Sequence, residues 1–105
     1  MNESIELSKA LIGKSYEWTY SSGMQGNVTF TEDKANWEIV SGPSASNNYK
    51  VRVVGEGIYF VQWIEPEFKI TVTITINEMT NKVYSSVVSQ DDIEFDVGDI
   101  TSIKG

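Results

Sequence analysis

Apolar and polar side chains alternate with a period of two along most of this chain, in short segments separated by turn-forming residues. The clearest segment is 70–76 (ITVTITI), in which Ile and Val alternate with Thr. Successive side chains of an extended strand point to opposite faces, so this segment has one apolar face and one polar face. All its residues are β-branched, which favours strands over helices. The pattern therefore predicts an all-β protein.

Further segments show the same alternation and are expected to form strands. They are 16–20, 27–31, 34–40, 48–54, 57–64, 82–89 and 92–97, and a short final strand could follow at 100–104. Segment 57–64 is apolar on both faces, which is typical of a strand between two packed layers. About eight regularly spaced strands indicate an up-and-down barrel or a sandwich. Of these two we expect the barrel, and specifically a small antiparallel barrel of the calycin (lipocalin-like) kind.

Only residues 3–12 favour a helix. Acidic residues fall in its first turn, Lys9 lies late, and Gly13 can take the left-handed conformation that ends helices. We therefore expect a single domain over 1–105, with an N-terminal helix and cap at 1–13 and the barrel at 14–105. A chain of this length buries roughly two-thirds of its surface on folding, which suffices for a core without disulfides or metal.

Composition excludes several functions. The chain has no Cys and no His, so disulfides, thiolate nucleophiles and His-based catalysis are not available, and we expect no metal site and no cofactor. Its net charge of −7 has the wrong sign for binding a phosphate backbone, so nucleic acid is not an expected partner. No segment has the ~20 apolar residues of a membrane-spanning helix. The start of the chain is acidic, unlike a signal peptide, so we expect a cytoplasmic protein.

Many large aromatic residues lie in the predicted strands for so short a chain. Among them are Trp18, Tyr20, Trp37, Tyr49, Tyr59 and Trp63. A closed eight-stranded barrel has room inside for side chains or for one small ligand. The rings therefore either fill the core or line a pocket for a small apolar or aromatic ligand, to which Tyr and Trp would offer a polar group.

Glu65 is the most pointed candidate for chemistry. It precedes Pro66 and has the same parity as Tyr59, Val61 and Trp63. If that face points inward, burial would raise the pKa of Glu65 and suit it to general acid–base catalysis. If not, Glu65 is a solvated carboxylate at a turn.

An acidic run near the C-terminus resembles a calcium loop at first sight. It consists of Asp91, Asp92, Glu94, Asp96 and Asp99. The glycine and final glutamate of a calcium loop are not in their places, and apolar residues alternate with the acidic ones. We expect a strand whose acidic face is solvated.

Two blocks of sequence carry a family resemblance. Leu11-Ile12-Gly13-Lys14 is followed by Trp18-Thr19-Tyr20 and Gly23, and the block 57–66 reads GIYFVQWIEP. In order and spacing, from about Leu11 to Val88, these resemble the phenolic acid decarboxylases and the related MoaF-like proteins, both calycin-like barrels. The block that ends Trp-x-Glu-Pro is the more specific of the two.

The resemblance implies a site. In the decarboxylases two tyrosines hold the substrate carboxylate, an arginine assists, and the Glu before Pro handles the proton. Glu65 matches that Glu and Tyr20 the second tyrosine. Trp18 stands at the first tyrosine, and the arginine position falls near Asn47, in a loop expected at 41–48.

Three hypotheses follow. The first is a binding barrel that holds a small apolar or aromatic ligand among Trp18, Tyr20, Trp37, Asn47, Tyr49, Trp63 and Glu65. The second is a lyase, such as a decarboxylase, or an isomerase that acts on a small aromatic acid, with Glu65 as general acid–base and Tyr20 positioning the substrate. The third is an interaction module with a filled interior. An exposed edge at 70–76 would also favour a homodimer.

Overall fold

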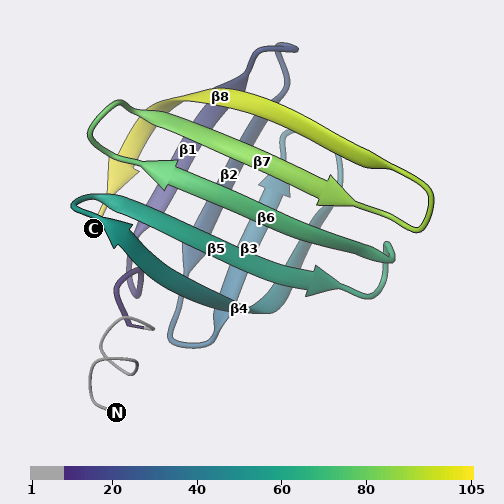
Figure 1. The fold of residues 1–105 in the computed structure, drawn as a ribbon, viewed down its shortest axis with the longest axis horizontal. Helices are drawn as coiled ribbons and strands as arrows, with labels where there is room; N and C mark the ends of the chain where they lie inside the picture. The colour runs from purple at the N-terminus through teal and green to yellow at the C-terminus, as the bar shows by residue number, and fades with distance from the viewer. Residues whose placement is uncertain (1–8) are drawn as a thin grey trace.

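The computed structural model describes residues 9–105, which form a closed barrel of eight antiparallel strands in up-and-down order (Figure 1). Strands and short turns alternate along the chain, and β8 pairs with β1 to close the barrel. The strands are β1 (Ser15–Tyr20), β2 (Gln25–Phe30), β3 (Lys34–Ile39), β4 (Ser44–Gly55), β5 (Ile58–Glu65), β6 (Ile70–Asn77), β7 (Lys82–Val88) and β8 (Ile93–Lys104). The expected calycin-like barrel is confirmed.

The expected helix at 3–12 falls mostly on residues outside those described. Its described part, from Lys9 to Gly13, forms turns rather than a helix, with Ile12 N donating to Lys9 O at 3.2 Å. Gly13 does take a left-handed conformation, with φ of 84°. Among residues 9–105, no helix is long and apolar enough to cross a membrane.

Two long strands change partner along their length. The first half of β4, Ser44 to Asn48, pairs with β3, and its second half, Tyr49 to Gly55, pairs with β5. Likewise, β8 pairs with β7 through Ile93–Asp99 and with β1 through Gly98–Lys104. The segments expected at 92–97 and 100–104 are therefore one strand, and the loop expected at 41–48 is largely the start of β4.

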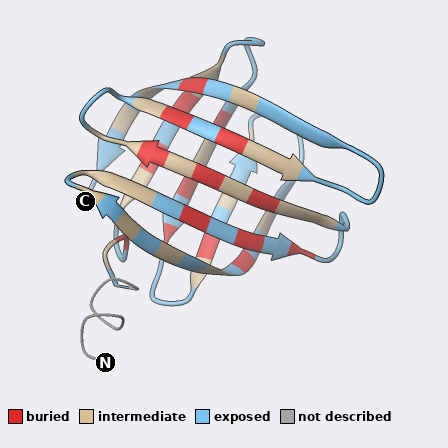
Figure 2. Ribbon diagram, viewed as in Figure 1, coloured by how far each residue is buried: buried red, intermediate tan, exposed pale blue. Residues whose placement is uncertain are grey.

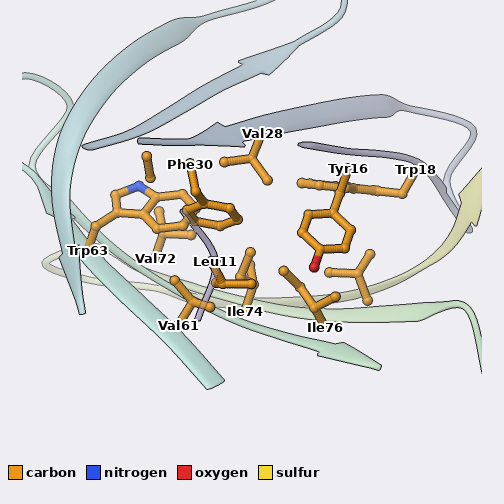
Figure 3. Close-up of a cluster of buried hydrophobic side chains, with 12 residues drawn as sticks. Leu11, Tyr16, Trp18, Val28, Phe30, Val61, Trp63, Val72, Ile74 and Ile76 are labelled. Carbon is orange, nitrogen blue, oxygen red and sulfur yellow. The ribbon is translucent and has the colours of Figure 1, made fainter. Parts of the chain in front are cut away.

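Alternation along the strands builds the core, as expected (Figure 2). Val72, Ile74 and Ile76 of β6 point inward and are buried, while the intervening Thr residues face outward. Figure 3 shows buried side chains of several strands converging in the barrel interior, together with Leu11 from the segment before β1. Leu11 is fully buried, so this segment closes one end of the barrel.

Two expectations about the sheet were wrong. β5 is buried on one face only, because Phe60 and Ile64 of its other face are exposed and no second layer covers them. β6 is not an edge, since it pairs with β5 on one side and β7 on the other. The edge from which we expected a homodimer therefore does not exist.

The parity of β8 is also opposite to expectation. Ile93, Phe95 and Val97 are exposed, whereas Asp96 and Gly98 share the inward parity, and Gly98 is buried. The physical reason is the packing of Gly98. A Cβ at this position would lie 2.9 Å from Cδ1 of Trp18, so glycine must lie beneath that ring. A two-residue period then turns Asp96 and Glu94 to the same side.

Truncating a core residue of β6 should destabilise the barrel strongly. We expect Ile76→Ala to lower the free energy of unfolding by about 2–5 kcal/mol, because Ile76 is fully buried and the change leaves a cavity. The neighbouring outward change Thr75→Ala should cost less than about 1 kcal/mol. Urea denaturation followed by circular dichroism measures both, and equal losses would contradict the assigned parity.

Candidate functional site

A cavity of about 540 Å³ occupies the barrel end that carries the β1–β2, β3–β4, β5–β6 and β7–β8 turns. Its inner wall is largely aromatic and aliphatic, with Trp18, Trp37 and Trp63 among its rings. Met24 and Pro43, from two of the turns, lie at its mouth. The opposite end is filled by buried side chains and Leu11, so the barrel is hollow at one end only.

Two glycines make room for the indole of Trp18. Gly26 of β2 pairs with Trp18, and a Cβ there would lie 3.0 Å from the indole Nε1. Gly98 of β8 lies under the other edge of the ring, as described above. Because the neighbouring strands on both sides carry no side chain at these places, Trp18 can lie flat inside the wall.

The polar groups of the cavity are few. The Tyr20 hydroxyl and Ser85 Oγ share a hydrogen bond of 2.8 Å, and burial raises the pKa of Tyr20. The indole N–H groups of Trp18 and Trp63 are buried and make no hydrogen bond. The N–H of Trp18 lies near enough to the Tyr20 oxygen to lower the pKa of that hydroxyl, although the geometry falls short of a hydrogen bond. Trp63 is thus the clearer case of a free donor.

A chain of hydrogen bonds runs from the cavity wall to Glu65. Trp37 Nε1 donates to Asn47 Oδ1 at 2.8 Å, and Asn47 Nδ2 donates to Glu65 Oε1 at 3.0 Å. The other carboxylate oxygen, Oε2, accepts from the backbone N–H groups of Glu67 at 2.5 Å and Phe68 at 3.1 Å. Glu65 is only 2% exposed and is not among the residues that line the cavity. Glu65 therefore holds Asn47, and through it Trp37, without contacting the cavity itself.

The pKa of Glu65 is therefore shifted in the direction opposite to our expectation. The hydrogen bond from Asn47 lowers it most, the Phe68 and Glu67 N–H groups lower it further, and together they outweigh burial, which raises it. Hydrogen bonds to the charged form stabilise a carboxylate even where it is desolvated. Glu65 is thus a buried but ionised carboxylate.

The structure brings some of the expected site residues together and separates others. Trp18, Tyr20, Trp37 and Trp63 all line the cavity. Asn47 and Glu65 support it through Trp37. Tyr49 does not reach it: its ring packs on Phe30 at 4.9 Å between centroids, and its hydroxyl donates to Thr31 O at 2.9 Å.

Sequence reasoning missed several lining residues. Ser85 has the parity of Val83 and Val87 in an apolar strand, and this signal could have identified it as an inward polar group. Asp96 and Glu94 also lie along the cavity. Ser21 Oγ donates to Asp96 Oδ1 at 2.9 Å, which ties the β1–β2 turn to β8. No signal in the local pattern placed Asp96 and Glu94 at the cavity, because their position depends on how distant strands pair.

The charges that line the cavity are all negative. They come from Glu38, Glu94 and Asp96, and none of the lining residues is Lys or Arg. A carboxylate ligand would therefore have no ion-pair partner among the residues that line the cavity. Within 9–105, no three acidic side chains are grouped so as to hold a metal ion.

A second polar cluster seals the filled end of the barrel. Glu78 Oε2 accepts hydrogen bonds from Lys14 Nζ at 2.8 Å and from the Tyr16 hydroxyl at 2.5 Å. Lys14 also lies 5.3 Å from the centre of the Tyr59 ring. Burial opposes the charge on Glu78, but these two donors and the charge of Lys14 lower its pKa overall. The cluster ties β1 to the β6–β7 turn.

The lowered pKa of Glu65 leads to a prediction about acid stability. A carboxylate whose pKa is lower in the folded state stabilises the fold fully above its unfolded pKa, near 4.3. That contribution is lost as the pH falls through the lower, folded value. Glu65→Gln, which places an amide N–H against existing donors, should lower Tm at neutral pH, and its deficit relative to wild type should shrink in acid.

Thermal unfolding followed by circular dichroism from neutral to acidic pH measures this deficit. Glu67→Gln is the matched control, because Glu67 is exposed and only two residues away. The control should unfold like wild type at each pH. A Glu65→Gln protein with unchanged Tm would contradict the supporting role of the carboxylate.

Comparisons with known proteins agree with this architecture. The family model described as the MoaF N-terminal domain matches residues 2–91. No curated protein matches the chain. The crystal structure of a protein from Burkholderia vietnamiensis, described as a "putative beta-lactamase", superposes with a TM-score of 0.76 at 18% identity, covering 87% of this chain and 93% of that one. This likeness concerns the fold alone. The match to the family model, which spans most of the sequence, shows that the chain belongs to the family described as the MoaF N-terminal domain.

Proposed function

We propose that this protein binds a small, largely apolar molecule in the cavity. The observation that carries the proposal is a cavity of about 540 Å³ that has a largely apolar wall with the hydroxyl groups of Tyr20 and Ser85 on it. Small-molecule sites typically measure about 300–1,000 Å³ and combine apolar walls with a few polar groups. Trp63 in this wall also has a buried N–H without a partner, which costs about 1–3 kcal/mol. An occupant that shifts the indole and accepts from it would remove that cost.

The lining also bears on the charge of the ligand. A carbonyl, ether or hydroxyl oxygen can exchange a hydrogen bond with the Tyr20–Ser85 pair. It can also accept from Trp63 once the indole shifts to bring its N–H to the cavity surface. A carboxylate would meet acidic groups and no cation. Burying an unpaired charge is far costlier than burying a neutral acceptor. We therefore propose a neutral aromatic or apolar ligand with at least one oxygen acceptor.

Glu65 serves this site indirectly in our proposal. Its carboxylate holds Asn47, and Asn47 holds the indole of Trp37 against the cavity. Glu65, which we expected among the residues around the ligand, would therefore not touch it, and the residues in front of it would make the contacts. Such a support fixes the rotamers of the residues that line a pocket and so preorganises it.

A lyase with Glu65 as general acid–base is the less supported function. The Tyr20 hydroxyl does lie in the cavity, as such an enzyme needs. However, both oxygens of Glu65 are occupied, and its lowered pKa makes it a weak base near neutral pH. The acidic lining also disfavours an aromatic acid as substrate.

Removing the indole N–H of Trp63 should weaken the binding of a ligand that carries a hydrogen-bond acceptor. We expect Trp63→Phe to reduce the affinity for methyl 4-hydroxycinnamate about 3- to 10-fold, because one hydrogen bond contributes about 0.5–1.5 kcal/mol. Binding of 4-vinylphenol, which has the same ring but no carbonyl, should change less. Tyr49→Phe, which removes a hydroxyl outside the cavity, is the control. Equilibrium dialysis measures each affinity.

The charge of the probe gives an independent readout. Wild-type protein should bind the methyl ester at least ~10-fold more tightly than the free acid, which would bury an unpaired carboxylate. Tighter binding of the acid would overturn the proposed ligand class. The binding function itself would be overturned by two results together. The protein would bind none of the ester, the acid and 4-vinylphenol, and a crystal structure would show the cavity filled by side chains.

The lyase hypothesis has its own test. Incubated with 4-hydroxycinnamic acid, the wild-type protein should leave the ultraviolet spectrum unchanged over time, since Glu65 is tied into the wall and cannot reach a substrate. Conversion to the vinylphenol spectrum by wild type but not by Glu65→Gln would instead establish a decarboxylase.

A further inference from the structure

Strands β5–β8 form the side of the barrel that lies towards the viewer in Figure 1, and their outward side chains share that side. Strand register aligns them in four rows across the four strands. The row Ile58, Asn77, Lys82, Asp99, at one end, carries an ion pair, and the next runs Phe60, Thr75, Tyr84, Val97. We call the alternate residues of 60–64, 71–75, 84–88 and 93–97 the outer face. Three residues come from each strand, and all but Phe95, which also borders the cavity, lie away from the residues that line it.

The outer face carries no charge and exposes large apolar groups. Its twelve residues include no Asp, Glu, Lys or Arg, in a chain with 15 acidic and 8 basic residues. Phe95 is 81% exposed, Ile64 67% and Ile93 61%. Figure 2 shows exposed residues along β5–β8, between the buried residues that point into the core. A strand face that meets only water normally carries polar side chains, so this composition indicates that something covers it.

The area is of the size that a stable protein contact needs. From their exposure, the rings of Phe60, Tyr84 and Phe95 leave on the order of 350 Å² accessible. The largest apolar patch on a typical monomer is about 300–600 Å², and the outer face reaches this range before its aliphatic and threonine side chains are counted. With them it approaches the ~800 Å² per partner of a standard interface.

The shape of the outer face suits a copy of itself. β6 contributes only Thr71, Thr73 and Thr75, which are smaller than the side chains of β5 and than Tyr84 of β7. Two such faces can pack as sheets about 10 Å apart, with large side chains of one against the small ones of the other. A two-fold axis makes the same patch serve on both sides.

Charged residues of both signs lie next to the face. Lys50 and Arg52 of β4 flank it beside β5, where they pair with Gln62 and Phe60. Asp91 and Asp92 lie in the β7–β8 turn, at the end of the strands. An axis parallel to the strands places the β5 side of one copy opposite the β8 side of the other. Lys50 and Arg52 of each copy then face the strand that follows the acidic turn of the other.

We infer that the outer face of β5–β8 is covered by a second copy of this chain, in a two-fold symmetric dimer packed sheet against sheet. The dimer leaves the cavity end open at the β1–β2 and β3–β4 turns. It does not depend on the proposed ligand. It also differs from pairing through a strand edge, which the closed barrel does not offer.

Matched lysine substitutions test this inference. Thr73→Lys places a charge at the centre of the outer face, where it would meet its own counterpart near the axis. Thr29→Lys is the control, because Thr29 is also an outward threonine with a cross-strand hydrogen bond, but lies on β2. Phe95→Lys is a second disrupting variant, at a residue too exposed to support the fold.

Sedimentation equilibrium over a range of concentrations measures the association, with circular dichroism to verify folding. Wild type and Thr29→Lys should have twice the mass of the chain, and both disrupting variants should raise the dimer dissociation constant at least ~100-fold. A wild-type monomer at every concentration would overturn the inference, as would a dimer that both variants leave intact. A monomer that co-sediments with phosphatidylcholine vesicles would assign the face to a lipid surface instead.

Discussion

β4 pairs first with β3 and then with β5. The carboxylate of Glu65 adds a side-chain link between β5 and the part of β4 that pairs with β3. It reaches from the end of β5 to Asn47 on the half of β4 that pairs with β3. With its other oxygen it caps the β5–β6 turn. A buried charge is tolerated here because both oxygens of the carboxylate accept hydrogen bonds. The wall that holds Trp37 depends on this bridge.

The two ends of the barrel differ because of what the strands carry there. At one end Leu11 and Tyr16 fill the interior, and Glu78 ties the first strand to a distant turn. At the other end Gly26 and Gly98 supply no side chains, so that the ring of Trp18 lies in the wall and a cavity remains inside. An eight-stranded barrel is only just wide enough to hold side chains, so a few small residues decide which end is hollow.

Much of this site was accessible from the sequence. The period-two pattern correctly placed Trp18, Tyr20, Trp37 and Trp63 on inward faces, because a side chain's face depends only on its parity within the strand. It did not reveal the environment of Glu65. Parity left open whether Glu65 is buried or solvated, and the structure buries it. The pKa depends on which hydrogen-bond donors surround the carboxylate, and the one that lowers it most, Asn47, comes from another strand.

The sequence by itself therefore determined the β-rich fold, the approximate number of strands, the turns that separate them and which aromatic residues share a face, since all of these follow from local alternation and turn chemistry. Only the tertiary structure decided the rest. Closure removed the edge expected at β6, the position of Gly98 under Trp18 turned Ile93 and Phe95 outward, and the partner change in β4 made Glu65 a bridge. Each of these results depends on contacts between strands far apart in the chain, which no local pattern records.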